Sequence, residues 1–187
     1  MDVVIFGHGA HARDMAATFT GKRDRVFFDD DDPSKVTVRG VKLRRNVRRL
    51  LGVNDPKLRN KLWLQQLNKY SHNGRWVHPS AHIGPEVVLG RHVHVNAGAF
   101  LTRCTLGDCS TVGPNATICG DVTIGREVMV GANATIKNLV TIGDGAVIGA
   151  GAIIADDVPP GVTMVSPKAV PLVSKSETMA SAVMGSC

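Results

Sequence analysis

Residues 112–154, VGPNATICGDVTIGREVMVGANATIKNLVTIGDGAVIGAGAII, place an aliphatic residue at every sixth position. A small or β-branched residue follows four positions after each of these anchors, as a narrow interior requires. Glycine directly follows many anchors, where a tight turn needs it. Repeats of six residues are typical of a parallel β-helix, in which three repeats make one triangular coil of about 18 residues. The sequence therefore predicts a thin solenoid that stacks against copies of itself, with a homotrimer as the expected closure.

One interval in this array is shorter than the others. The anchors run back from Val112 to Ile83, and every interval is six residues except Leu101–Leu106, LTRCTL, which is five. The missing residue raises the question of whether it disturbs the fold, the chemistry or both.

The composition excludes several classes of protein. Apolar residues make up 43% of the 187 residues and charged residues 20%, as in an ordinary soluble protein. No apolar run approaches the roughly 18 residues of a membrane span, and the start MDVVIFGHGAH does not resemble a signal peptide. The four cysteines form no CxxC pair. We expect a reduced, cytoplasmic protein with free thiols, no bound metal and no membrane contact.

The sequence before the repeats predicts a small α/β unit. Apolar runs at 2–6, 25–28 and 48–53 predict strands, and 12–19 and 55–70 predict helices, the second with Asp55 as N-cap. We expect an α/β domain at 1–77, the β-helix at 78–170 and a C-terminal tail at 171–187. GHGAH after the first strand suits an anion at a helix start, although the full GxGxxG is absent. Four acids, 29–32, end the second strand; they either bind a ribose or form an acidic surface turn.

Positive charge is concentrated in the first part of the chain. Residues 1–78 contain 16 lysines and arginines against 8 acids, and the densest stretch is RGVKLRRNVRR, Arg39–Arg49. The stretch is either a solvated face or a site that attracts polyanions. It has no aromatic residue to stack on bases, and a nucleotide-bearing small molecule fits this charge as well as nucleic acid does. We do not expect nucleic acid as the partner.

Several stretches, in this order, resemble the nucleotide-sugar N-acetyltransferases of the PglD and NeuD type. They are VVIFGHGAHARDMA, VFFDDDDP, GVNDPKLRNKL, HPSAHIG, the hexapeptide array and VIGAGAIIADDVPPGVTMVSPKAV. The resemblance implies a trimeric left-handed parallel β-helix with an N-terminal nucleotide-binding, Rossmann-like domain that is trimmed here. It implies acetyl transfer from acetyl-CoA to the amine of a UDP- or GDP-linked amino sugar.

The resemblance also implies binding residues. The sugar-nucleotide loop corresponds to Gly7, His8, Gly9, Ala10 and His11, and the nucleoside contacts to Asp29, Asp30 and Asn54, where Asn54 departs from the family's glycine. The acetyl-CoA contacts correspond to Thr111, Gly120, Ala132 and Ala150. These four are otherwise only the small turn residues that the fold needs.

The short repeat falls where the family carries its histidine base and the acid beside it. Thr102 or Arg103 stands there instead, and no acid follows. A thiol nucleophile at Cys104, activated by Arg103, is conceivable, but a packed thiol is the expectation. His94 is a further candidate base, although His92 and His94 read as surface turn residues.

Two functions from different classes remain open on the sequence. The leading one is an N-acetyltransferase without the usual histidine base. The alternative is a non-catalytic trimeric relative that binds sugar nucleotide or acyl-CoA.

Overall fold

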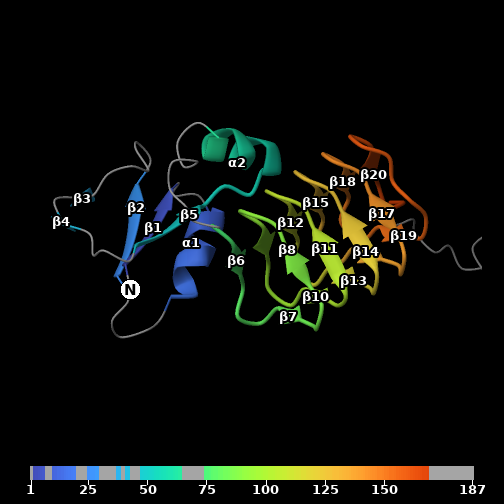
Figure 1. Cartoon of the computed structure of the whole chain (residues 1–187), viewed down its shortest axis with the longest axis horizontal. Helices are drawn as coiled ribbons and strands as arrows, with labels where there is room; N and C mark the ends of the chain where they lie inside the picture. Colours follow the sequence, from blue (N-terminus) through green and yellow to red (C-terminus); the bar gives the residue numbers. More distant parts are fainter. Residues whose placement is uncertain are drawn as a thin grey trace, which may run out of the picture.

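The structure is a computed structural model that describes residues 2–6, 10–19, 25–29, 37–38, 41–42, 47–64 and 74–168. Most of the described chain forms a parallel β-helix whose short strands stack from coil to coil (Figure 1). The prediction of a β-helix built from hexapeptide repeats is confirmed. The coil has three faces, and each face is one parallel sheet.

We name each face after a central strand. The β12 face contains β6 Trp76–Val77, β9 His94–Val95, β12 Thr111–Val112, β15 Met129–Val130, β18 Val147–Ile148 and β20 Thr163–Met164. The β13 face contains β7 His82–Ile83, β10 Phe100–Leu101, β13 Thr117–Ile118, β16 Thr135–Ile136 and β19 Ile153–Ile154. The β14 face contains β8 Val88–Leu89, β11 Cys104–Leu106, β14 Val122–Ile124 and β17 Thr141–Ile142.

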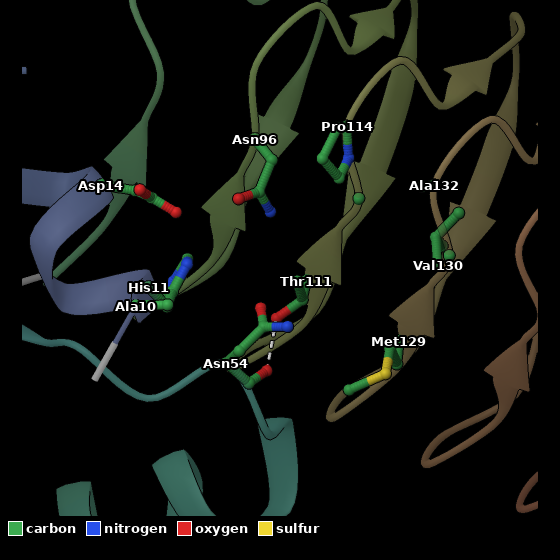
Figure 2. Close-up of a pocket in the computed structure, with 12 residues that line it drawn as sticks. Ala10, His11, Asp14, Asn54, Asn96, Thr111, Pro114, Met129, Val130 and Ala132 are labelled. Carbon is green, nitrogen blue, oxygen red and sulfur yellow. Dashed lines mark hydrogen bonds between the residues drawn. The ribbon is translucent and has the colours of Figure 1, made fainter.

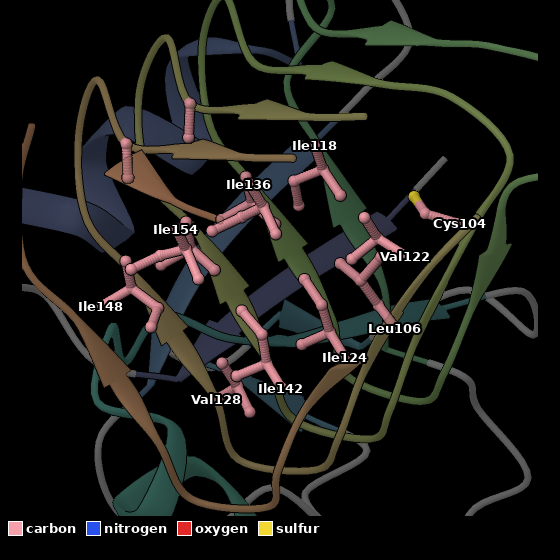
Figure 3. Packing of buried hydrophobic residues seen from close by; sticks show 14 of the residues in the cluster. Cys104, Leu106, Ile118, Val122, Ile124, Val128, Ile136, Ile142, Ile148 and Ile154 are labelled. Atoms are coloured by element: carbon pink, nitrogen blue, oxygen red, sulfur yellow. The ribbon is translucent and has the colours of Figure 1, made fainter. Parts of the chain in front are cut away.

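The core of the coil is the column of anchors and the small residues between them (Figure 3). Leu101, Ile118 and Ile136 are completely buried, and each lies over the equivalent anchor of the next coil. Alanine and valine fill the positions four residues after the anchors, because the triangular interior has no room for larger side chains. The predicted division between anchors and small residues is confirmed from Val95 onward, whereas the first anchor, Ile83, is 38% exposed.

Glycine follows the anchors for a different reason from the turn geometry that we expected. Their φ angles are not positive; instead, the backbone of the next coil lies against them. A Cβ on Gly107 would come within 2.6 Å of the carbonyl carbon of Gly125, and one on Gly113 within 2.7 Å of the nitrogen of Ala132. Glycine is needed here for the close approach of two coils.

The short repeat shortens a turn and leaves the strands in register. Cys104 pairs with Val122 and Leu106 with Ile124, so Cys104 takes the interior position that valine takes in the next coil. The turn between β10 and β11 therefore has two residues, Thr102 and Arg103, where the next coil has three.

Arg103 makes both of the backbone hydrogen bonds that two separate residues make in the longer turns. Elsewhere the second turn residue offers its carbonyl to the next coil, and the third, at positive φ, donates its N–H to the previous coil. Arg103 has a φ of 40°, donates to the carbonyl of Pro85 at 3.2 Å and accepts from the N–H of Asp121 at 2.6 Å. The ladder of hydrogen bonds at this corner thus stays continuous despite the deletion.

The N-terminal elements lie beyond the β6 end of the coil, with α2 alongside it (Figure 1). The strands β1 Asp2–Phe6, β2 Arg25–Asp29 and β5 Val47–Leu51 form a parallel sheet in the order β2-β1-β5. The helices are α1 Ala10–Ala17 and α2 Pro56–Leu62, and β3 Thr37–Val38 pairs with β4 Val41–Lys42. Asp55 accepts a hydrogen bond from the N–H of Leu58 at 2.8 Å, so the predicted N-cap is confirmed.

We predict that burial alone separates two neighbouring isoleucines in β19. Ile154 is 3% exposed and Ile153 is 71% exposed. Ile154→Ala should lower the free energy of unfolding by about 2–5 kcal/mol, because it leaves a cavity in the coil. Ile153→Ala should change the free energy of unfolding of the single chain by less than about 0.5 kcal/mol, measured at a protein concentration low enough to keep the chain monomeric. Urea denaturation of both variants measures this, and equal losses would contradict the assigned inward and outward positions.

Candidate functional site

The N-terminal elements are tied to the coil by one buried guanidinium. Arg59 of α2 is fully buried, although arginine is rarely buried without a charged partner. Its Nε donates to the carbonyl of His92 at 2.9 Å, and its Nη1 to that of Val53 at 2.7 Å. Its Nη2 donates to the carbonyls of Cys109 and Ser110 and to Thr111 Oγ1.

These partners are neutral oxygens, and none is a carboxylate. Burial lowers the pKa of Arg59 to about 10, so the guanidinium remains charged at neutral pH. Five donors in a fixed fork can satisfy several diverging carbonyls at once, which a lysine ammonium cannot do in the same geometry. The arrangement fixes α2 and the segment before it against the β12 face.

A cavity of about 550 Å³ opens where the N-terminal elements meet the β12 face (Figure 2). Ala10, His11 and Asp14 of α1 and Asn54 line one side. The coil lines the other side with Asn96, Thr111, Gly113, Pro114, Met129, Val130, Gly131 and Ala132. The cavity therefore has a polar part near α1 and an apolar, narrow part along successive coils.

His11 is held in place by a second histidine. His11 Nε2 and His94 Nδ1 are 3.0 Å apart, and the Trp76 ring lies edge-on to both imidazoles. Burial, together with the charge of Arg59, lowers the pKa of His11 to about 4, although Asp14 opposes the shift. The same causes lower the pKa of His94 well below its ordinary value. Both imidazoles are neutral at neutral pH, and one donates to the other.

The expectation that His92 and His94 are surface turn residues is wrong. Both side chains are buried, because the N-terminal elements cover this end of the coil. Neither ring nitrogen of His92 nor the Nε2 of His94 has a hydrogen-bond partner among the described residues. His94 touches the cavity only through His11, so it is not placed to act on a substrate directly.

Thr111 and Asn54, both predicted as binding residues, meet behind the cavity. Thr111 Oγ1 accepts from Arg59 Nη2 at 2.7 Å and donates to the carbonyl of Asn54 at 3.3 Å (Figure 2). Arg59 also donates to that carbonyl at 3.3 Å. The buried guanidinium therefore fixes the backbone at Asn54 and the hydroxyl of Thr111 together.

The structure brings five of the predicted binding residues to one cavity. They are Ala10, His11, Asn54, Thr111 and Ala132. Ala150 stacks on the coil beyond Ala132 and is exposed outside the cavity. Gly120 lies at a different corner, under the guanidinium of Arg103, which a Cβ on Gly120 would meet at 2.5 Å.

The remaining predicted binding residues lie outside the described part of the chain. These are Gly7, His8, Gly9 and Asp30; of Asp29, only the backbone position at the end of β2 is described. The side chains of the basic stretch 39–49 and the tail 171–187 are likewise not described.

The corner that resembles the family's catalytic position holds a different set of groups. A cavity of about 250 Å³ is lined there by Glu86, Arg103, Cys104, Thr105, Asp121, Val122 and Thr123. Arg103 pairs with Asp121 at 3.0 Å, and both side chains are about half exposed. None of these described lining residues is a histidine.

Cys104 is a packed thiol, as expected, and the alternative of a thiol activated by Arg103 is wrong. Its side chain points into the core of the coil (Figure 3). Burial raises the pKa of the Cys104 thiol to about 11. Cys109 is similarly buried, and its pKa is also raised to about 11. Neither thiol is ionised at neutral pH, and a thiol that is not ionised is a poor nucleophile.

The described residues contain no group of three or more histidine, cysteine or acidic side chains that could hold a metal ion. Neither described helix has the length and apolar character to cross a bilayer.

Comparison with known proteins finds that part of the coil is similar to bacterial transferases. Residues 103–138 match the family model described as bacterial transferase hexapeptide (six repeats). The match begins at Arg103, inside the short interval, and continues through the part of the array where the six-residue register is uninterrupted. No curated protein matches the sequence.

Solved structures extend the similarity to nearly the whole chain. A mutant of perosamine N-acetyltransferase from Caulobacter crescentus, in complex with CoA and GDP-perosamine, is 26% identical, with a TM-score of 0.69 over 89% of this chain and 94% of that one. The acetyltransferase domain of PglB from Neisseria gonorrhoeae, in complex with acetyl coenzyme A, is 22% identical, with a TM-score of 0.69 over 91% and 98% of the two chains. The fold is that of hexapeptide-repeat transferases, and the predicted resemblance to nucleotide-sugar N-acetyltransferases is confirmed.

Sequence reasoning missed three residues at this site. Arg59 is one residue of the helix predicted at 55–70, and nothing in the neighbouring sequence indicates that a guanidinium is buried there. Asp14 and Asn96 line the cavity but belong to no motif. Asn96 immediately precedes a turn, and Pro114 begins the equivalent turn of the next coil, but only the folded coil shows that both reach the same opening.

We predict that removing the Arg59 guanidinium destabilises the whole molecule. Arg59→Met keeps much of the side chain but removes the guanidinium that donates to the carbonyls of Val53, His92, Cys109 and Ser110 and to Thr111 Oγ1. The free energy of unfolding should fall by about 3 kcal/mol or more. The control is Arg126→Met, since Arg126 is exposed and pairs only with Asp144 at the surface. Chemical denaturation should show little change for the control; similar midpoints for both variants would contradict the assigned role of Arg59.

We also predict that acid weakens the fold through the buried histidines. The pKa of His92 is about 4, mainly because of burial, and that of His94 is also lowered, whereas both return to about 6.5 in the unfolded chain. Between about pH 6.5 and 4 the unfolded state binds more protons, so the free energy of unfolding falls as the pH falls. The expected slope is about 1.4 kcal/mol per pH unit for each buried histidine.

Urea midpoints at about pH 7, 6 and 5 measure this slope. His92→Asn should reduce it, because asparagine does not titrate and tolerates the positive φ of 54° at this position. His82→Asn, on an exposed histidine, is the matched control. A slope that His92→Asn leaves unchanged would show that the buried imidazole is not its source.

Proposed function

We propose that the protein is an acetyltransferase that transfers the acetyl group of acetyl-CoA to the amine of a UDP- or GDP-linked amino sugar. The observation that carries the proposal is the cavity between α1 and the β12 face. It brings residues expected to bind sugar nucleotide, Ala10, His11 and Asn54, against residues expected to bind acetyl-CoA, Thr111 and Ala132. The likeness to a perosamine N-acetyltransferase bound to CoA and GDP-perosamine supports the same reaction class.

The cavity suits both substrates chemically. Gly113, Gly131 and Ala132 leave a narrow path along the coil, and Met129 and Val130 make it apolar, as a pantetheine arm requires. When bound there, acetyl-CoA would supply an activated thioester. The nucleotide would lie toward the predicted N-terminal domain, 1–77, whose loop before Ala10 is the expected phosphate site. Because both substrates are cytoplasmic metabolites, we place the reaction in the cytoplasm.

We further propose that the assembly is a homotrimer. The β13 face presents apolar side chains to solvent in the single chain: Phe100 is 44% exposed and Ile153 is 71% exposed. A thin coil gains a second packed surface when such faces meet. In a trimer, the corner at Arg103 of one copy could complete the cavity of another.

The reaction can proceed without a histidine at that corner. A positioned general base is worth about 10²–10⁴-fold, whereas holding two reactants together supplies about 7–11 kcal/mol. A sugar amine already exists partly as the free base near neutral pH. Substrate alignment in the cavity is therefore sufficient for measurable turnover.

One observation favours the alternative of a non-catalytic relative that binds sugar nucleotide or acyl-CoA. At the corner where the family carries its base, the described residues offer Arg103 paired with Asp121 and a buried thiol. Loss of the base without any replacement is what a binding protein derived from an enzyme would show.

We predict that the protein releases free CoA thiol when acetyl-CoA is mixed with a UDP- or GDP-linked amino sugar. The pH profile of kcat should rise toward the pKa of the sugar amine, with no separate limb near the roughly 6.5 of an ordinary histidine. Cys104→Ala should reduce kcat less than tenfold, because the thiol is buried and protonated. The same nucleotide sugars without an amine are the control and should give no thiol.

Binding of acetyl-CoA without turnover on any amino-sugar nucleotide would contradict the enzyme and favour the binding protein. Complete loss of turnover in Cys104→Ala, with ligand affinities intact, would instead make the thiol the catalyst.

A further inference from the structure

The polar wall of the cavity, near α1, has two side-chain acceptor groups, the Asp14 carboxylate and the Asn96 amide oxygen. In Figure 2 the Asp14 carboxylate from α1 and the side-chain oxygen of Asn96 from the coil both point into the space beside His11. Asp14 has no ion pair or hydrogen bond among the described residues. Two acceptors that face one space are stabilised by a ligand that places a hydrogen-bond donor or a positive charge there.

The orientation of Asn96 is fixed by the coil. Its Nδ2 donates at 2.7 Å to the carbonyl of Val112, which lies in the next coil on the β12 face. The backbone N–H of Asn96 donates to the same carbonyl at 3.0 Å. One N–H of the amide is therefore engaged by the protein, which fixes the orientation of the group, and Oδ1 is the acceptor that it presents to a ligand.

The lining of this wall carries a negative charge. Among the described residues that line the cavity there is no lysine or arginine, and Asp14 is the one ionised side chain. The buried Arg59 lies outside this lining. Its positive charge reaches His11, whose pKa it lowers, but its donors are engaged by the coil and by the segment before α2 and are not free for a ligand. His11 does not neutralise the charge of Asp14 at neutral pH, because burial lowers the pKa of His11 to about 4.

We propose that Asp14 and Asn96 form an amine-binding subsite that selects an acceptor sugar carrying an amine over the same sugar carrying a hydroxyl. This inference rests on the proposed function and adds which residues hold the acceptor group. An ammonium has three donors and a positive charge, so it can satisfy the Asp14 carboxylate and Asn96 Oδ1 together. A hydroxyl has a single donor and no charge, and it leaves one of the two acceptors unpaired.

The same wall is unsuited to a phosphate. An anion beside Asp14 would meet a like charge, and no described cation lines the cavity to offset it. The nucleotide end of the substrate therefore belongs outside this subsite, and the sugar end lies within it. Asp14 and Asn96 are specificity-determining residues in this scheme. They hold the acceptor as its ammonium in the ground state, and the ammonium releases a proton to solvent before the free amine attacks the thioester.

The experiment compares two matched ligands by calorimetry. The probes are GDP-perosamine and the GDP-linked 6-deoxyhexose that carries a hydroxyl in place of its amine. The wild-type protein should bind the amine at least about tenfold more tightly, and this preference should shrink as the pH rises through the pKa of the sugar amine. Asp14→Asn should remove most of the preference and leave the affinity for acetyl-CoA unchanged.

Two further variants sharpen the comparison. Asp156→Asn makes the same chemical change at an exposed turn residue outside the cavity and should behave as the wild type. Asn96→Ser should reduce the preference for the amine by a smaller factor, since Asp14 keeps the charge. In steady-state assays, Asp14→Asn should raise KM for the amino sugar about tenfold and lower kcat less than threefold, as expected for a group that binds the acceptor in its ground state.

Equal affinity of the wild-type protein for both ligands would overturn the subsite. An equal loss for both ligands in Asp14→Asn would do the same, because it would show a structural effect of the variant.

Failure of the proposed function gives a different result: neither nucleotide sugar would bind. The subsite is then tested by following the His11 ring resonances during titration with glucosamine and with glucose. A saturable shift with glucosamine alone, lost in Asp14→Asn, would support the subsite. The same response to both sugars, or to neither, would overturn it.

Discussion

The arrangement of the site depends on one buried cation, the guanidinium of Arg59. It donates to carbonyls in two successive turns of the coil, at His92 and at Cys109–Ser110, and to carbonyls of the segment that leads into α2. A charge without a carboxylate partner is stable in the interior only when its donors are all engaged by oxygens in fixed positions. The geometry of the coil supplies such positions, because stacked turns present their carbonyls at regular spacing. Through this contact the N-terminal elements are held where α1 faces Thr111 and Ala132 across the cavity.

The short repeat and the cavity are independent features of the same coil. The deletion at Thr102–Arg103 removes one turn residue, and Arg103 maintains both of the hydrogen bonds that a longer turn would share between two residues. The strands on either side remain in register, so the β12 face and its cavity are undisturbed. A coil of this type can therefore lose a residue at one corner without a change at another. This separation explains how the proposed substrate-binding wall can persist while the corner that resembles the family's catalytic position has changed.

The periodicity of the sequence predicts the coil well, because each hexapeptide is a local rule repeated along the chain. Ile118, Ile136 and Ile154 are buried where the six-residue spacing places them. The burial of His92 and His94 could not be predicted in this way, since it results from the N-terminal elements that cover one end of the coil. The reason for glycine at Gly107 or Gly113 is also absent from the local pattern, because it lies in the backbone of the following coil. Asp14 and Asn96 are 82 positions apart in the sequence, and only tertiary packing brings them to one opening.

A crystal structure of the protein with CoA and GDP-perosamine tests the central claim most directly. The claim is that the cavity fixed by Arg59, between α1 and the β12 face, receives the acceptor sugar. The account predicts the sugar amine within hydrogen-bonding distance of Asp14 and Asn96 Oδ1, and the pantetheine arm beside Gly131 and Ala132. A sugar amine bound away from α1, with the cavity filled by water, would contradict it.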